Sequence, residues 1–388
     1  MPPPDSGASV GTVVCVDSLD AVDRDEWNAL AGDRYPFLRY EFLAAAEQTG
    51  CVTAETGWQP RHLLYQRNGQ TVAALPLYEK THSWGEFVFD WAWAQAYDRV
   101  GLDYYPKLVS AVPFTPATSP RLLLADGDDN EALQALHRAA LKLADDIDAS
   151  SLHVQFPTDE ESAKWVSTGL KLRRDCQFHW HNRNYGSFDE FLATFSSRKR
   201  KKARRDRRRV TEQGIRFRHL SGSDIDADLW ETVYQLISIT FLRRGSMPYY
   251  NLEFFRSVSA SMPASILVVL AEQRGVPIAA SVFFRGADTL YGRYWGSDGH
   301  YDALHFETCY YQGIEHCIQH GLAIFEPGTQ GEHKISRGFV PATTYSAHWL
   351  RHPQFFDAIA RYLEEEGEHV ERYMDAVEQH TPYRRDGD

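Results

Sequence analysis

The stretch from Gln66 to Tyr78, QRNGQTVAALPLY, is written a second time from Glu272 to Phe284 as EQRGVPIAASVFF. In the first copy Asn68-Gly69 separates two apolar runs, which is a strong signal for a β-hairpin. A second pair of similar segments, Tyr40–Leu43 and Leu252–Phe255, is offset by 212 residues, against 206 for the first pair. Two matches in the same order predict a duplicated α/β unit of about 200 residues.

Each copy continues with large side chains at every second position, from Phe87 to Trp93 in the first copy and from Tyr291 to Trp295 in the second. A period of two predicts a β-strand with its large side chains on one face. That face either packs against helices or forms the aromatic wall of a cleft. The order of strands and helices, repeated, predicts an α/β fold with mixed sheets and a cleft at or between them.

The two copies are expected to be separate units with a helical segment between them. Ser187-Phe-Asp-Glu190 is a capping-box pattern, and Gly214 is a plausible end of the helical stretch that follows. We therefore predict a first domain at residues 12–186, a basic helical bridge at 187–213 and a second domain at 214–352. Residues 353–380 predict an amphipathic C-terminal helix.

Composition limits the class of protein. The chain has 388 residues, 43% hydrophobic and 24% charged, which suits about two globular domains. No run approaches about 18 consecutive apolar residues, and the first residues have no secretory pattern, so we expect no transmembrane helix and a cytoplasmic protein. The five cysteines are scattered and form no CxxC pair, so neither a disulfide framework nor a cysteine zinc site is expected.

The net charge of −12 is unevenly distributed. Residues 198–209, RKRKKARRDRRR, contain ten basic residues and one acid, so the rest of the chain carries −21. As a helix this run is charged on every face, with Ala203 its one apolar residue, and it therefore lies in solvent or binds phosphates. An acidic body with one basic segment indicates a local anionic partner.

Several segments resemble the FemAB-like family, a group of proteins with two tandem GNAT-type (acyl-CoA N-acyltransferase) domains. The resemblance covers roughly residues 15–380. It implies two tandem GNAT-like domains and a transferase that joins an activated acyl or aminoacyl group to an amine, as in relatives that add amino acids from aminoacyl-tRNA to peptidoglycan precursors. The segments that carry it are Phe37–Leu43, Trp58–His62, Ala74–Tyr78, Phe89–Ala94, Tyr104–Lys107, Val112–Pro116, Ser196–Lys202, Tyr294–Asp298 and Gly328–Lys334.

The loop from Gly328 to Phe339 contains several residues that could act in catalysis or bind a ligand. Lys334 and Arg337 could hold a phosphate or carboxylate and stabilise an oxyanion, and Glu332 or His333 could accept a proton from an attacking amine. The alternative is a surface turn with local salt bridges. Gln330 belongs to the same polar loop and is a candidate for substrate binding, and the resemblance matches Lys334 and Phe339 to a lysine and an aromatic residue near the acceptor of Fem-type relatives.

Further candidates come from the resemblance. It implies contacts with a substrate pyrophosphate or with a bound tRNA for four cations, Arg198, Lys199, Arg200 and Lys202. It also implies that the side chain of Glu307 points toward the cleft. The strand around Tyr294 and Trp295 would supply substrate contacts and backbone N–H groups for the oxyanion. His316 and His320 are four residues apart but no carboxylate partner is indicated, so no metal site is expected.

One absence bears on the donor. GNAT domains that use acyl-CoA carry an Arg/Gln-x-x-Gly-x-Gly/Ala loop after the aromatic strand, where backbone N–H groups bind the pyrophosphate. After Asp298 this chain reads GHYDALHFE, without that motif. We therefore expect no tightly bound cofactor. The absence favours aminoacyl-tRNA or an unknown donor over acyl-CoA, and the sequence leaves the identity of the donor open. The alternatives are a non-catalytic module that recognises a peptidoglycan or nucleotide ligand, or an RNA-binding protein.

Overall fold

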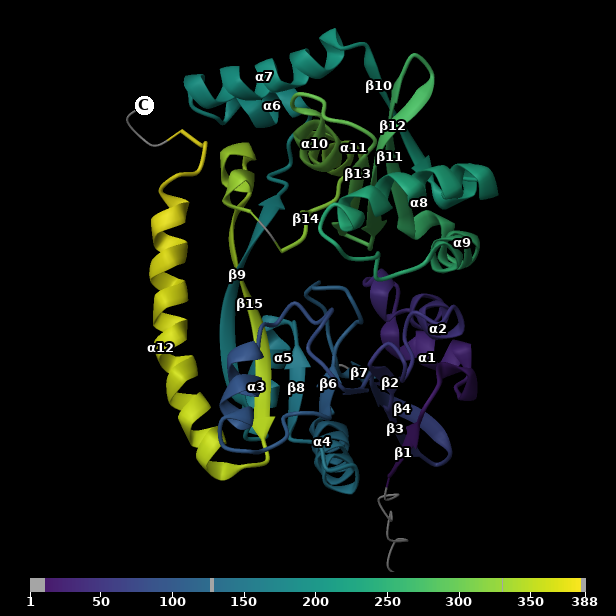
Figure 1. Ribbon diagram of the computed structural model, residues 1–388, viewed down its shortest axis with the longest axis vertical. Coiled ribbons are helices and arrows are strands. Elements are labelled where there is room, and N and C mark those ends of the chain that lie inside the picture. Colours follow the sequence, from purple (N-terminus) through teal and green to yellow (C-terminus); the bar gives the residue numbers. More distant parts are fainter. Residues whose placement is uncertain (1–10, 126–128, 330, 385–388) are drawn as a thin grey trace, which may run out of the picture.

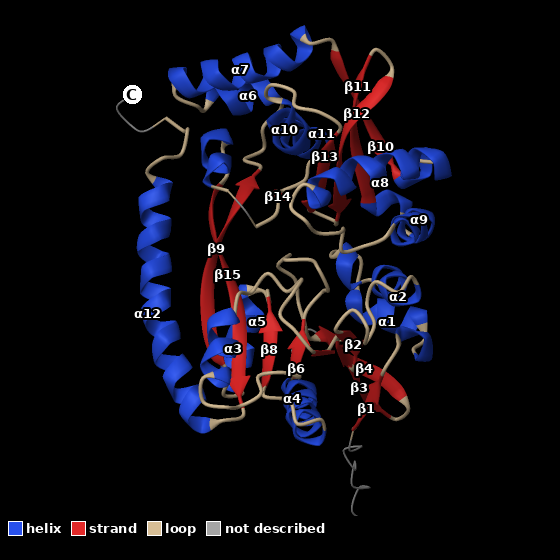
Figure 2. Cartoon of the chain, in the orientation of Figure 1, coloured by secondary structure: helices blue, strands red, loops and turns tan. Residues whose placement is uncertain are grey.

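The computed structural model describes residues 11–125, 129–329 and 331–384 and contains a four-stranded and an eleven-stranded sheet covered by helices (Figures 1 and 2). The fold is therefore the mixed α/β fold predicted. No helix in these ranges has the length and apolar character needed to cross a bilayer. The elements of the first half are β1 (Thr12–Val16), α1 (Arg24–Ala31), α2 (Tyr40–Gln48), β2 (Trp58–Pro60), β3 (His62–Arg67), β4 (Gln70–Leu75), β5 (Tyr78–Lys80), α3 (Trp91–Asp98), β6 (Lys107–Ser110), β7 (Leu123–Leu124), α4 (Asn130–Asp146), β8 (Ser151–Gln155), α5 (Asp159–Ser167) and β9 (Lys171–His181).

The elements of the second half are α6 (Phe188–Ala193), α7 (Ser197–Glu212), β10 (Ile215–Ser221), α8 (Ala227–Leu242), α9 (Leu252–Ser261), β11 (Ile266–Gln273), β12 (Val276–Arg285), β13 (Thr289–Ser297), α10 (Leu304–Phe306), α11 (Gln312–His320), β14 (Ile324–Glu326), β15 (Val340–Leu350) and α12 (Pro353–Glu378). In the second half the order β10, α8, α9, β11, β12 corresponds to β1, α1, α2, β3, β4 of the first half, which has the short strand β2 in addition. A π-helical turn, Glu307–Tyr311, joins α10 to α11. The C-terminal helix matches the predicted 353–380.

Both repeated segments form the predicted hairpins, β3–β4 and β11–β12. Their turns, Asn68-Gly69 and Arg274-Gly275, have positive φ at both residues, as a type I′ turn requires. The second repeated pair forms the helices α2 and α9, which pack against each other through Phe42 and Phe254, whose rings are 5.2 Å apart. The similar sequences therefore mark equivalent elements of the two halves.

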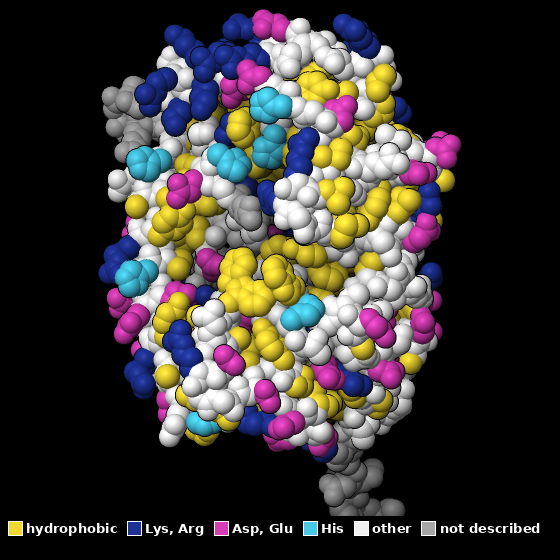
Figure 3. Space-filling model, in the orientation of Figure 1, with side chains coloured by type: hydrophobic (Ala, Val, Ile, Leu, Met, Phe, Trp, Pro, Cys, Tyr) yellow, Lys and Arg dark blue, Asp and Glu magenta, His cyan; other side chains and the backbone are white. Residues whose placement is uncertain are grey.

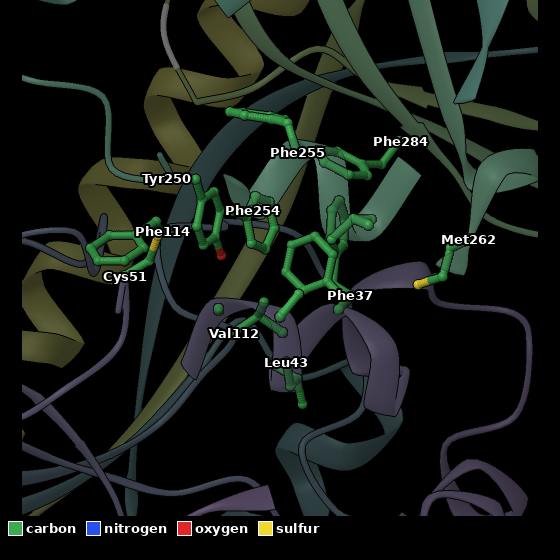
Figure 4. Packing of buried hydrophobic residues seen from close by; sticks show 14 of the residues in the cluster. Phe37, Leu43, Cys51, Val112, Phe114, Tyr250, Phe254, Phe255, Met262 and Phe284 are labelled. Atoms are coloured by element: carbon green, nitrogen blue, oxygen red, sulfur yellow. The ribbon is translucent and has the colours of Figure 1, made fainter. Parts of the chain in front are cut away.

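The two halves share one large hydrophobic core. Phe37 of the first half contacts Phe284 of the second at 5.3 Å between ring centroids, and Figure 4 shows both beside Phe254. Aromatic edge-to-face pairs of this kind add to the stabilisation from burial alone. The halves are thus joined by packing over α2 and α9.

The halves also exchange strands. β9, from the first half, pairs with β14 and with β15 of the second half, and β15 pairs in turn with β8 of the first. Figure 1 shows β9 and β15 running side by side under α12. The guanidinium of Arg173 on β9 donates to both carboxylate oxygens of Glu366 on α12 at 2.7 Å. The two predicted domains, residues 12–186 and 214–352, are therefore linked by strand pairing. Their boundaries remain a prediction.

Two local predictions are wrong. Residues 87–94 form no strand: Phe87 has a positive φ, and α3 begins at Trp91, so that Trp93 and Tyr97 present one helical face to His348 and Phe355. The loop before α3 is held instead by buried Lys107, which donates to Glu86 and Asp90.

The second wrong prediction concerns the basic helical bridge. It consists of two helices, α6 and α7, and between them Phe195 pairs with Tyr383 in an isolated β-bridge. Ser187 caps α6 as predicted, and Gly214 has a φ of 72° at the end of α7. One face of α7 is buried through Ala203, Asp206 and Val210, although the sequence indicated a helix in solvent on every side.

Candidate active site

A cavity of about 330 Å³ lies between the two halves, where β13 and β14 separate. These parallel strands pair only over Thr289–Tyr291 and Ile324–Glu326, and beyond Tyr291 β13 has no partner on that side among the described residues. Polar backbone of β13 is thereby available to a ligand. The cavity is lined by Phe87, Phe114 and Pro116 from the first half and by Phe241, Arg244, Tyr249, Gly292, Arg293, Tyr294, His305, Tyr310, Pro327, Gly328, Thr329, His333 and Lys334 from the second.

A smaller cavity of about 100 Å³ adjoins the first and shares Gly292, Arg293 and Tyr294 with it. Trp295 and Cys309 line this extension. Both predicted strand residues, Tyr294 and Trp295, therefore lie at the walls of the site.

Lys334 is held in the cavity wall by the short 3-10 helix Glu332–Arg337. It is 1% exposed, and its ammonium donates to the carbonyl oxygen of Gly328. Gly328 and Gly331 have φ values of 96° and 108°, which suit glycine and let the backbone fold around the lysine. Burial, and then the nearby charge of Arg293, lower the pKa of Lys334 to about 7. Its amine is therefore poised between its charged and neutral forms near neutral pH.

His333 also lines the cavity, beside Lys334. Its Nε2 and the hydroxyl of Tyr310 share a hydrogen bond of 2.8 Å. Burial, followed by the charges of Arg337 and Lys334, lowers the pKa of His333 below its usual range. The imidazole is then neutral at neutral pH and can accept a proton from a ligand.

Arg293 and Arg244 are members of the site that the sequence reasoning missed. Two nitrogens of Arg293, Nε and Nη2, are shielded from solvent and have no hydrogen-bond partner, while Nη1 donates to the Gly292 carbonyl at 2.9 Å. No carboxylate among the described residues lies within ion-pair distance of this guanidinium. A cation within a predicted buried strand is the signal that could have identified Arg293.

A buried acid lies near the cavity without lining it. Glu326, at the end of β14, is 4% exposed, and burial raises its pKa to about 7, although Arg293 opposes this rise. No carboxylate is among the described lining residues. The lining therefore presents cations and imidazoles, which suits an anionic ligand.

Other predicted residues are placed elsewhere. The hydroxyl of Tyr373 donates to exposed Glu332, and Arg337 lies over the ring of Phe306 and donates to the carbonyl of His333 at 2.6 Å. Phe339 is fully buried against Tyr310 and Phe325. These three residues do not line the cavity, and Gln330 lies outside the described residues.

Glu307 is also engaged away from the cavity. It accepts hydrogen bonds from Arg207 on α7 at 3.0 Å and from Gln312 at 2.6 Å. His316 and His320 stack at 4.0 Å between centroids, and no group of three potential metal ligands occurs in the described part of the chain. By accepting hydrogen bonds from both Arg207 and Gln312, Glu307 joins α7 to the rest of the second half.

The predicted cations of α7 form a separate surface. Figure 3 shows Lys and Arg side chains gathered over α7 at one end of the molecule, and exposed Arg198, Lys201 and Lys202 have no acidic partner among the described residues. Lys199 and Arg200 are half-buried on the same helix. The remaining cations are largely paired, as in Arg204 with Asp189 and Arg209 with Asp302.

A family model described as FemAB-like, peptidoglycan biosynthesis/recognition, matches residues 18–385. Among solved structures, FemX is similar with a TM-score of 0.53 and 13% identity over 87% of this chain and 98% of its own. The C-terminal domain of a putative lysylphosphatidylglycerol synthetase from Agrobacterium fabrum gives 0.55 and 9% over 88% and 95%, and L-PGS from Bacillus licheniformis gives 0.51 and 11% over 86% and 98%. No curated protein matches the sequence.

Proposed function

The chain belongs to the FemAB-like family of transferases with the tandem GNAT fold, and from this premise we propose that it transfers an aminoacyl group to an amine held between its halves. The proposed acceptor is a cell-wall precursor, in line with the description of the family. The observation that carries the proposal is the cavity at the separation of β13 and β14, which contains Lys334 and His333.

The proposed reaction is direct acyl transfer. The amine attacks the ester carbonyl of the donor, and its proton passes to neutral His333. Backbone N–H groups of β13 beyond Tyr291 and the ammonium of Lys334 are proposed to stabilise the developing oxyanion. When the carbon–oxygen ester bond breaks, the leaving oxygen takes the proton back from His333. Holding both reactants in one cavity supplies much of the acceleration.

The charges of the cavity favour an anionic substrate group. Arg293 and Lys334 are cations without a carboxylate partner in the described residues, and Arg244 adds a third at the rim. A buried guanidinium binds carboxylates and phosphates strongly because it can donate two parallel hydrogen bonds. We propose that the acceptor presents such a group beside its amine.

The transfer rate is expected to depend on pH with a narrow maximum. Because His333 must be neutral, kcat/KM rises as the pH passes its pKa, which burial and the charges of Arg337 and Lys334 hold below its usual range. Because Lys334 must be protonated, kcat/KM falls as the pH passes about 7. A pH profile of kcat/KM for the donor, with the acceptor held at saturation, measures both limbs. Lys334→Arg should abolish the falling limb below about pH 9, since a guanidinium stays charged, and an unchanged limb would assign it to another group.

The proposed donor is aminoacyl-tRNA, with α7 as a contact for its phosphates. Reversing two exposed cations one helical turn apart, Arg198→Glu with Lys202→Glu, is expected to raise the KM for aminoacyl-tRNA about tenfold or more and to reduce the salt dependence of binding. The measurement is formation of labelled aminoacyl product over a range of salt concentrations.

A matched control changes the charge equally at the opposite end of the molecule. Arg138→Glu with Lys142→Glu lies on α4, far from α7 in Figure 1, and should leave the KM unchanged. Equal effects of the two pairs would mean that α7 is not a specific contact. Binding of precursors without any product from aminoacyl-tRNA or acyl-CoA would reject the transferase proposal and favour a binding module.

A further inference from the structure

Two loops meet at the mouth of the cavity. The first, residues 81–90, joins β5 to α3, and the second, residues 243–251, joins α8 to α9. Phe87 of the first loop and Tyr249 of the second both line the cavity, with their rings 5.8 Å apart. Whatever these loops contact therefore lies at the entrance of the proposed active site.

Both loops expose large hydrophobic side chains. Trp84 and Phe89 are 66% and 64% exposed, and Trp84 contacts Trp91, the first residue of α3, at 5.3 Å between centroids. On the other side, Leu242, the last residue of α8, and Met247 of the second loop are 57% and 67% exposed. In Figure 3 hydrophobic side chains gather beside the central hollow of the molecule. Exposed hydrophobic side chains gathered in this way mark a site of interaction.

The charges beside these side chains have one sign. Both acids of the first loop, Glu86 and Asp90, turn inward and are neutralised by buried Lys107, so neither reaches the surface. The second loop contains no acid and exposes Arg243 and Arg244. In a chain with a net charge of −12, these two loops present apolar groups and cations but no exposed carboxylate.

We propose that the mouth of the cavity docks on the anionic lipid–water interface of a bilayer. Tryptophan and phenylalanine partition into the headgroup region, and arginine pairs with lipid phosphates, so the two loops match both layers of that surface. This inference rests on the proposed function, because it places the entrance of the proposed active site at the membrane surface.

The test is co-sedimentation of the full chain with phosphatidylcholine vesicles that contain or lack phosphatidylglycerol, at low and high salt. We expect binding to the anionic vesicles and at least about tenfold weaker binding after Trp84→Ser with Phe89→Ser. Arg243→Ser should weaken binding to anionic vesicles and reduce its salt dependence. A control pair of exposed hydrophobic residues away from the cavity, Val276→Ser with Tyr362→Ser, should bind as the unchanged chain does.

Two outcomes overturn the docking proposal. One is an unchanged chain that binds neither kind of vesicle, or that binds equally after Trp84→Ser with Phe89→Ser. The other is self-association in sedimentation velocity that the same pair abolishes, because the surface is then an interface between copies.

Transfer to a water-soluble amine acceptor, measured without vesicles, separates this inference from the proposed function. Neither Trp84 nor Phe89 lines the cavity, so the pair should leave that rate unchanged. Transfer without vesicle binding overturns only the docking surface. Vesicle binding without transfer overturns the proposed function.

Discussion

Lys334→Ala is expected to lower kcat/KM for aminoacyl transfer by about 10²–10³-fold, the usual cost of removing one donor to a developing oxyanion. The lysine is buried in the cavity wall and has no carboxylate partner in the described residues, so its charge is available to the reacting group. Because the interaction is strongest in the transition state, the loss should fall mainly on kcat.

The fold should survive this substitution. A buried cation without an ion-pair partner contributes little to stability, so thermal unfolding of Lys334→Ala should remain close to that of the unchanged chain. Lys142→Ala, on the exposed side of α4, is a control for loss of a lysine away from the cavity and from α7. Full transfer activity in Lys334→Ala would remove this residue from the mechanism.

Lys107→Ala is expected to lower the free energy of unfolding by about 3–5 kcal/mol, because it leaves two buried carboxylates without their cation. Lys107 is fully buried and donates to Glu86 at 2.9 Å, to Asp90 and to Ser83 at 2.8 Å. Burial opposes the charge of Lys107, but Glu86 and Asp90 together raise its pKa above its usual value. Burial alone would likewise raise the pKa of Asp90, yet Lys107 and His153 lower it to about 2.

The difference in free energy of unfolding between Lys107→Ala and the unchanged chain should become smaller at acid pH. In the unchanged chain, the depressed pKa of Asp90 gives stability that is present above about pH 4 and lost as the pH falls toward 2. Without Lys107, burial raises the carboxyl pKa values, so the variant gains stability as these groups protonate. Chemical denaturation from about pH 7 to 4 measures the difference. Lys107→Ala with Glu86→Gln should recover part of the loss, and a deficit independent of pH would contradict this electrostatic account.

Local sequence signals predicted those parts of the fold that neighbouring residues determine. The Asn68-Gly69 turn, the Ser187 cap and the strand around Tyr291 depend on a few adjacent residues, and the structure contains each of them. The strand predicted from the alternating rings of Phe87–Trp93 was wrong because a residue distant in sequence determines the structure of that segment. Buried Lys107 forms ion pairs with Glu86 and Asp90.

The same distinction applies to the site. His333 and Lys334 lie in the cavity because a short polar turn follows β14, which the sequence indicated. The resemblance predicted that Glu307 points toward the cleft. Instead, its carboxylate binds Arg207, which lies 100 residues away in sequence. Arg293 was counted as one member of an alternating strand, and its lack of a partner is visible only once the surrounding side chains are placed.

The exchange of β9 and β15 has a consequence for biosynthesis. While the ribosome is still making the second half, β8 has β6 as a strand neighbour but lacks β15, because residues 340–350 have not yet been made. An unpaired edge beside a finished strand invites pairing with another nascent chain. The sheet of the first half is therefore incomplete, and its β8 edge is open to aggregation, until β15 has been synthesised.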